Sequence, residues 1–336
     1  MRPSHSTISP VRTVSILTVL DRQVDADAFR PSYCDRTQKI YFARNLRRDL
    51  LPSLARPVNS PALSEFEGYF RRPWIDVNQF LFDAPVEYMP DYAREIGMTV
   101  SYASLLLMLD FTPQQKELLT NYLVQYGIDL FGCLEVGYRG WPGHGGHSSG
   151  RKLPIVLAGI LLDDARMKKV SKLYPRKFGE DMLTFYVRET PPAGIYTAAW
   201  QGATVVYGGY VGITGESVDP AWRPYEHLQP REWKSTLGEQ YRRCCTSVAW
   251  VGQALTVRLL HAESVWDHPA FFDYVDRWMY EPDKENREEI RRHFPDFRLT
   301  DDAWWSQQGN TWEPFVKAMW DRYRTMEGMP GVDGWR

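Results

Sequence analysis

Apolar residues recur every three or four positions over most of the chain, which is the spacing that buries one face of a helix. Between residues 74 and 170 this spacing predicts four successive helices, over residues 74–82, 91–109, 113–136 and 153–170. After Trp233 it predicts four more, over residues 237–260, 268–280, 284–293 and 312–324. A mainly helical protein is therefore expected.

The predicted helices differ in how much of their surface is apolar. Residues 96–109 carry almost no charge on any face and residues 155–162 are apolar throughout, so both segments should be buried all round. Residues 113–123 place glutamines, a lysine and a glutamate beside leucines, which is a one-sided pattern. Alternation of buried and half-exposed helices predicts an (α/α) toroid or incomplete barrel of inner and outer helices.

Two other regions depart from the helical pattern. Residues 184–187 and 204–207 are β-branched and aromatic, which predicts a small extended or β insertion near residues 180–212. The first 60 residues are basic and irregular, with one helix predicted over residues 36–51. We expect residues 1–60 to form an arm or lid on the main body, and residues 61–336 to form a single helical-toroid catalytic domain.

Composition narrows the possible partners. The 40 basic and 42 acidic residues nearly cancel, so nothing attracts the whole chain to nucleic acid or to an anionic membrane. No apolar run approaches the ~20 residues that span a bilayer, so no membrane helix is expected. Residues 1–20 lack a small-residue cleavage pattern, so a secreted or periplasmic location is expected only if a signal peptide has been removed. The oligomeric state is not indicated.

The four cysteines are Cys34, Cys133, Cys244 and Cys245, and they show no metal-binding spacing. Adjacent cysteines seldom bridge each other, so mostly free, buried thiols are expected.

The glycine-rich segment 137–152 is the main candidate for chemistry. It joins two helices that should be buried, yet it is polar and holds cations and imidazoles without a carboxylate. Its glycines allow close approach of a ligand to the backbone, and its cations suit an anion. The alternative is a purely structural turn. The candidate ligand-contacting residues of this segment are Tyr138, Arg139, Trp141, His144, His147, Arg151 and Lys152.

Alternatively, His144 and His147 could bind a divalent metal ion, with Glu226 or His227 as a third ligand. The H-x-x-H spacing lacks the form H-E-x-x-H that places a base beside the metal. We therefore expect no cofactor, and the metal stays an alternative.

Three further segments carry candidate groups. Glu226 and His227 follow Tyr225 in a proline-rich loop, and Tyr241 with Arg242 begins a helix that becomes apolar after Cys244. The alternatives are an ordinary exposed loop and a salt-bridged helix end. Ahead of the most apolar helix stand Tyr92 and Arg94. Candidate sugar platforms or gates are Trp74, Asn78, Trp304 and Trp305, although core packing is the commoner role of tryptophan.

The helix alternation over residues 74–170, the loop Trp-Pro-Gly-His-Gly-Gly-His at 141–147 and Tyr-Arg-Arg at 241–243 resemble the helical-toroid polysaccharide lyases. The likeness covers about two thirds of the chain. It implies β-elimination on an alginate- or glucuronan-type acidic polysaccharide, with His and Tyr transferring protons and Arg, Asn or Glu around the uronate carboxylate.

Mapped onto this chain, the resemblance implies that Tyr241 is the leading acid or base. It implies that His144 and His147 act as base or carboxylate donors, and that Arg139, Arg151 and Arg242 hold the substrate. Glu226 and His227 are second-rank candidates for the catalytic site.

Two alternatives stay open. An (α/α)-barrel glycoside hydrolase needs a carboxylate pair about 5–10 Å apart, for which Asp76, Asp163, Asp164 and Glu226 are available. A non-catalytic carbohydrate-binding protein needs none of these groups to react.

Overall fold

The computed structural model describes residues 17–35, 37, 39–76, 88–90, 92–141, 146–187, 198–208, 225–297 and 313–336. The protein is mainly helical, as predicted. Its longer α-helices are α1 (Leu63–Phe70), α2 (Ala93–Leu107), α3 (Pro113–Glu135), α4 (Lys152–Leu161), α8 (Ser247–Leu259), α10 (Pro269–Tyr280), α11 (Asp283–His293) and α12 (Pro314–Tyr323). The shorter ones are α5 (Val170–Leu173), α6 (Gly179–Leu183), α7 (Leu237–Tyr241) and α9 (Glu263–Trp266).

Local sequence explains where several helices begin. The Thr112 hydroxyl caps α3 by accepting the Gln115 N–H, and the Gln115 side chain bonds back to the Thr112 N–H. Proline opens α3, α10 and α12, at the position where its missing N–H costs nothing.

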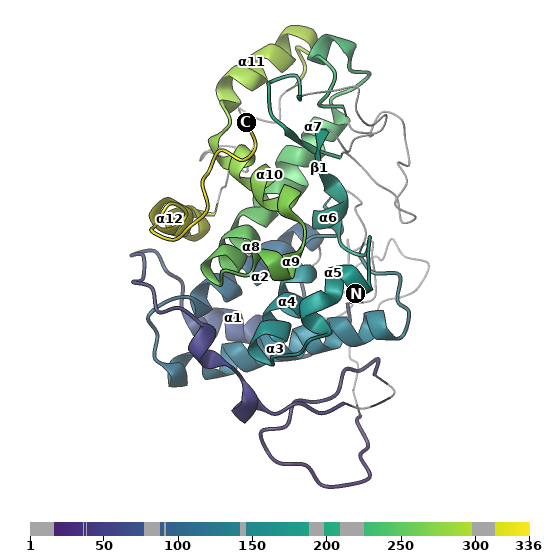
Figure 1. Ribbon diagram of the computed structural model, residues 1–336, viewed down its shortest axis with the longest axis vertical. Helices are drawn as coiled ribbons and strands as arrows, with labels where there is room; N and C mark the ends of the chain where they lie inside the picture. The colour runs from purple at the N-terminus through teal and green to yellow at the C-terminus, as the bar shows by residue number, and fades with distance from the viewer. Residues whose placement is uncertain are drawn as a thin grey trace.

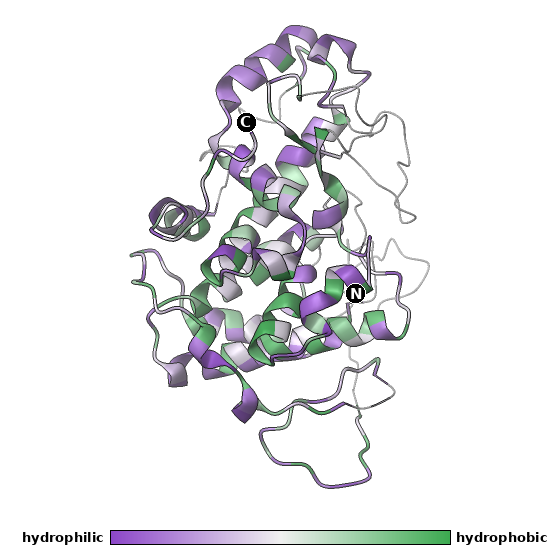
Figure 2. Ribbon diagram, in the orientation of Figure 1, coloured by the Kyte–Doolittle hydropathy of each residue, from purple (hydrophilic) through white to green (hydrophobic). Residues whose placement is uncertain are grey.

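Four helices form the centre of the molecule. α2 packs mainly on α8 and α3 mainly on α4 (Figure 1). Figure 2 shows these helices as the most hydrophobic part of the ribbon, whereas α11 at one end of the long axis is strongly hydrophilic. α2 and α4 are buried along most of their length, as predicted. α3 is more buried than predicted, because every residue from Tyr126 to Leu134 lies inside.

The predicted β insertion corresponds to a two-stranded antiparallel sheet. β1 (Thr184–Tyr186) pairs with β2 (Val205–Tyr207), with Phe185 opposite Val206. α10 packs against both strands.

Two predicted helices are wrong or shorter than expected. Residues 39–51 hold only the 3₁₀ turns Ala43–Asn45 and Arg48–Leu50. Backbone N–H groups here bond to other segments, that of Ala43 to the Asp27 carbonyl and that of Arg47 to the Leu161 carbonyl, and so do not continue a helix. The helix predicted over residues 153–170 ends at Leu161. The predicted helix over residues 74–82 lies mostly outside the described residues.

The described part of the N-terminal arm contacts the main body at several points. The Arg47 N–H donates to the Leu161 carbonyl at 2.7 Å, and Arg48 forms an ion pair with Glu117 on α3 at 2.7 Å. Leu54 forms a bridge with Leu109. The role of this arm as a lid stays a prediction. No helix in the described ranges has the length and apolarity that crossing a membrane requires.

Candidate functional site

Three segments that are distant in sequence meet at the start of α2. Tyr92 immediately precedes α2, and its ring stands edge-on to the His147 ring with centroids 5.1 Å apart. A Cβ on Gly146 would overlap the Tyr92 hydroxyl and would lie 2.8 Å from Cβ of Cys245. Glycine at position 146 therefore lets the glycine-rich segment approach both neighbours.

The third segment is the junction of α7 and α8. Residues Arg242–Thr246 form a π-helical turn between these two helices. Cys244 and Cys245 within this turn are joined by a disulfide, so the expectation that this adjacent pair does not bridge itself is wrong. Cys34 and Cys133 are free, with their sulfur atoms 3.4 Å apart.

Arg94 ties the π-helical turn to α2. Its Nη1 donates to the Cys244 carbonyl at 2.9 Å, and its Nε donates to Glu95 at 2.8 Å. The guanidinium also lies 5.5 Å from the centroid of the Tyr92 ring. We call Tyr92, Arg94, His147 and Tyr241 the tyrosine–histidine cluster.

Burial keeps the phenol of Tyr92, one member of this cluster, protonated at neutral pH. Burial raises the pKa of Tyr92, and the neighbouring Tyr241 raises it further. Burial also raises the pKa of Tyr207, which lies on β2 behind the cluster. A phenol in this state can donate a hydrogen bond, but it gives up its proton less readily than an ordinary tyrosine does.

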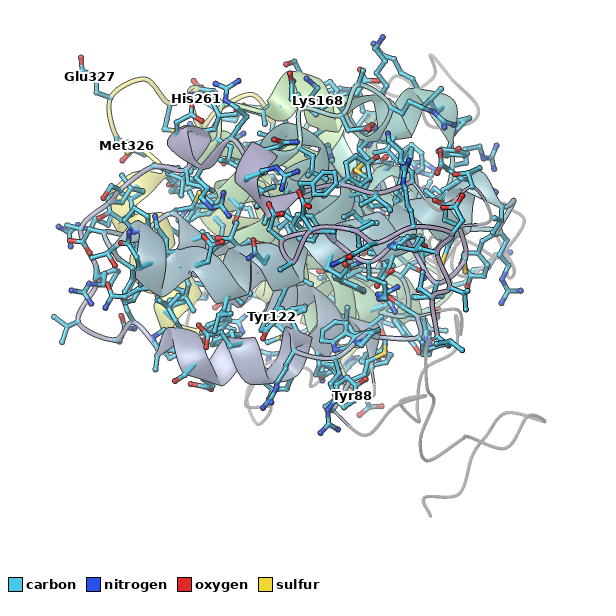
Figure 3. The ribbon with its side chains drawn as sticks, turned by 90° about the horizontal axis from the view of Figure 1, so that it is seen from below. Tyr88, Tyr122, Lys168, His261, Met326 and Glu327 are labelled. Carbon is cyan, nitrogen blue, oxygen red and sulfur yellow. A yellow bond between two sulfur atoms is a disulfide. The ribbon has the colours of Figure 1, made fainter. Side chains whose placement is uncertain are left out.

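A cavity of about 840 Å³ opens beside Tyr92 and Arg94. Its wall is rich in aromatic residues and includes three carboxylates. The aromatic and acidic residues of this wall are Phe66, Tyr69, Tyr88, Tyr92, Tyr102, Glu65, Glu95 and Glu313. Tyr88 lies at the edge of the molecule in the view from below (Figure 3). The sequence indicated only Tyr92 and Arg94 of this wall, because its other members come from separate stretches of the chain.

Several predicted substrate-binding residues are instead buried in ion pairs. Arg151 is fully buried and forms a two-pronged pair with Asp76, at 2.8 and 2.9 Å. The Lys152 ammonium pairs with Asp181 at 2.6 Å and lies over the Trp266 ring. Neither side chain reaches the surface. Direct contact of either one with a ligand stays a prediction, and their burial in ion pairs does not favour it.

The two predicted tryptophans in the described part are also interior. Trp141 is fully buried and its indole N–H donates to the Asp76 carbonyl at 3.3 Å. Trp74 is 1% exposed and donates to the Tyr69 carbonyl at 2.8 Å. Both occupy packing positions, which was the alternative allowed for tryptophan.

Glu226 and Arg242 belong to a second buried network behind the cluster. Glu226 accepts the N–H of Tyr207 on β2 and pairs with Arg277. Arg242 pairs with Glu239 at 3.0 Å and with Glu281 at 2.7 Å. Because each charge is matched inside the protein, this network positions α7, α10 and β2.

The other predicted residues lie nearer the surface. Arg139 is exposed, and Tyr138 beside it packs on Trp141 with centroids 5.2 Å apart. His227 is half-buried, and burial lowers its pKa, which keeps the imidazole neutral near pH 7. His144, Asn78, Trp304 and Trp305 lie outside the described residues. Within the described ranges, no three His, Cys, Asp or Glu side chains form a group that could hold a metal ion.

No protein-family model matches this chain, and no curated protein or solved structure is significantly similar to it.

Proposed function

We propose that this protein is a polysaccharide lyase that cleaves a uronic-acid-containing polysaccharide by β-elimination, on an (α/α) toroid of helices. The observation that carries the proposal is the tyrosine–histidine cluster, in which Tyr92 stands edge-on to His147 beside an aromatic cavity. Proton acceptors and donors of this kind are what elimination requires.

In the proposed reaction a base removes the proton beside the uronate carboxylate. The carbon–oxygen bond to the leaving sugar then breaks, a carbon–carbon double bond forms, and the leaving oxygen takes a proton. His147 suits the base and Tyr241 the acid, or the reverse. Arg94 lies at the cavity wall and suits binding of the uronate carboxylate. Neutralising that carboxylate makes the neighbouring proton easier to remove.

The test is a screen of alginate, glucuronan, pectate and glycosaminoglycans for products that absorb as unsaturated uronates. With the best substrate, Tyr241→Phe and His147→Gln should each lower kcat about 10²–10⁴-fold. Tyr122→Phe is the matched control, because Tyr122 lies on α3 and does not line this cavity. Reducing ends released without that absorbance would contradict the lyase.

A glycoside hydrolase is the second candidate, because Glu65, Glu95 and Glu313 line the same cavity. Hydrolysis uses one carboxyl as acid and another as base or nucleophile. Loss of all turnover in Glu95→Gln or Glu313→Gln, with reducing ends as the product, would favour this candidate.

A non-catalytic carbohydrate-binding protein is the third reading. It predicts binding of the polysaccharide without any cleavage, and binding that survives in Tyr241→Phe.

A further inference from the structure

The cavity beside the tyrosine–histidine cluster has the size and lining of a sugar-binding site. Its volume of about 840 Å³ lies in the range of about 300–1,000 Å³ typical of small-ligand pockets. Phe66 and Tyr102 stack in its wall with centroids 5.2 Å apart. Tyr88 is held in place by a hydrogen bond to the Pro73 carbonyl at 2.8 Å. Rigid aromatic faces with hydroxyl groups suit sugar rings, which have apolar faces and hydroxyl edges.

The charges of the wall are opposite to those that a polyanion needs. Among the described residues that line the cavity, Glu65, Glu95 and Glu313 are accompanied by one cation, Arg94, so this part of the lining carries a net charge of −2. Arg94 is already paired with Glu95 and donates to the Cys244 carbonyl. One uronate can exchange with Glu95 at Arg94, but the other charged side chains of the described lining, Glu65 and Glu313, would repel a second uronate in the cavity.

From this charge pattern we propose that the cavity binds an uncharged sugar next to the cleaved uronate. Resting on the proposed function, this identifies the substrate as a polysaccharide in which uronate is linked to neutral sugars, and not a homopolymer of uronate. At a separation of about 6 Å in water, each glutamate would weaken binding of a second uronate about threefold.

The experiment compares glucuronan, in which every sugar is a uronate, with hyaluronan, in which glucuronate alternates with an uncharged sugar. We expect the wild-type protein to have a kcat/KM for hyaluronan at least tenfold higher at ~20 mM salt. The ratio should shrink near 1 M salt, where the screening length falls to about 3 Å. The triple variant Glu65→Gln, Glu95→Gln, Glu313→Gln should reduce the ratio about tenfold or more. Glu67→Gln, on α1 outside the cavity wall, should leave it unchanged.

Affinity electrophoresis of the same proteins in gels containing each polymer separates the two proposals. Selective retention by hyaluronan without cleavage would support the cavity inference and contradict the lyase. Equal cleavage of both polymers at low salt, unchanged in the triple variant, would overturn the inference and leave the lyase standing. Equal retention of both polymers without cleavage would overturn both. Neither cleavage nor retention of either polymer would overturn both.

Discussion

At the scale of single residues, buried ion pairs determine which basic side chains can still contact a ligand. Arg139 and Arg151 come from the same glycine-rich segment, yet one is exposed and the other is enclosed with Asp76. Composition shows that both are basic. The partner of Arg151 lies 75 positions away in the chain, so the sequence could not show which of the two arginines is buried.

Arg151→Met should destabilise the protein strongly, because it leaves the Asp76 carboxylate buried without its cation. Breaking such a pair typically costs about 3–5 kcal/mol. Urea denaturation should show this loss in the free energy of unfolding. Arg139→Ala is the control and should change it by less than about 0.5 kcal/mol; equal effects of the two substitutions would contradict the burial of Arg151.

Glu180 should make stability depend on pH. Burial raises its pKa to about 7, opposed by the hydrogen bond from the Gly150 N–H. Since the folded state holds this proton more tightly than the unfolded state, the contribution of Glu180 is full below about pH 4.5 and is lost as pH rises toward 7.

The wild-type protein should therefore lose stability on the order of 3 kcal/mol as the pH rises between these values, and Glu180→Gln should abolish this pH dependence. Thermal unfolding of both proteins from pH 4.5 to 8 measures the difference. Parallel curves over this range would show that Glu180 titrates normally.

At the scale of elements, helices were predictable where apolar spacing and a start signal agreed. α3 and α10 begin within one residue of their predicted starts, and both open with proline. The helix α4, which follows the glycine-rich segment, ends earlier than predicted, and the spacing of apolar residues does not show why. Asp163 adopts a positive φ of 52°, and the Asp164 carboxylate accepts the N–H groups of Arg166 and Met167. The apolar pattern continues across this turn.

Close helix packing gives glycine different roles at two helical positions. A Cβ at Gly127 would overlap the Pro154 carbonyl, where α3 meets α4, whereas a Cβ at Gly68 on α1 meets nothing within 4 Å. Gly127→Ala should cost about 1–3 kcal/mol, and Gly68→Ala should stabilise by about 0.5–1 kcal/mol. Differential scanning calorimetry should shift the two melting temperatures in opposite directions, and shifts of the same sign would contradict the packing.

The disulfide in the π-helical turn can be tested by counting the free cysteine thiols. Alkylation of the unfolded, unreduced protein should label two of the four cysteines, Cys34 and Cys133. After treatment with a dithiol reductant it should label all four, because Cys244 and Cys245 are released. Mass spectrometry of the alkylated chain reads both numbers, and four labels before reduction would exclude the bond.

At the scale of the whole molecule, the mainly helical class followed from the sequence, while the candidate site followed only in part. Tyr92, Arg94, His147 and Tyr241 were all recognised from their local sequences. Their meeting depends on α2 packing against α8, which no local pattern encodes. The cavity was missed because Glu313 and Tyr102 meet across 211 positions of chain.

Docking of the arm on the main body should make the two unfold together. Lys39 pairs with Asp164, and the Arg47 N–H donates to the Leu161 carbonyl at the end of α4. We expect hydrogen exchange at the Arg47 amide to be as slow as in α4 itself. Exchange at the rate of an unstructured peptide would show instead that the arm separates from the body.

The π-helical turn also sets the rotational phase between α7 and α8. An α-helix advances about 100° per residue, and a π turn accommodates one residue more than an α turn. Glu239 on α7 can therefore face the buried arginines while Trp250 on α8 faces Ser149, to which it donates at 3.0 Å. Losing a single residue between 242 and 246 would restore regular winding and turn Tyr241 about 100° away from Tyr92. The length of this turn is thus as specific a requirement as the identity of any side chain in it.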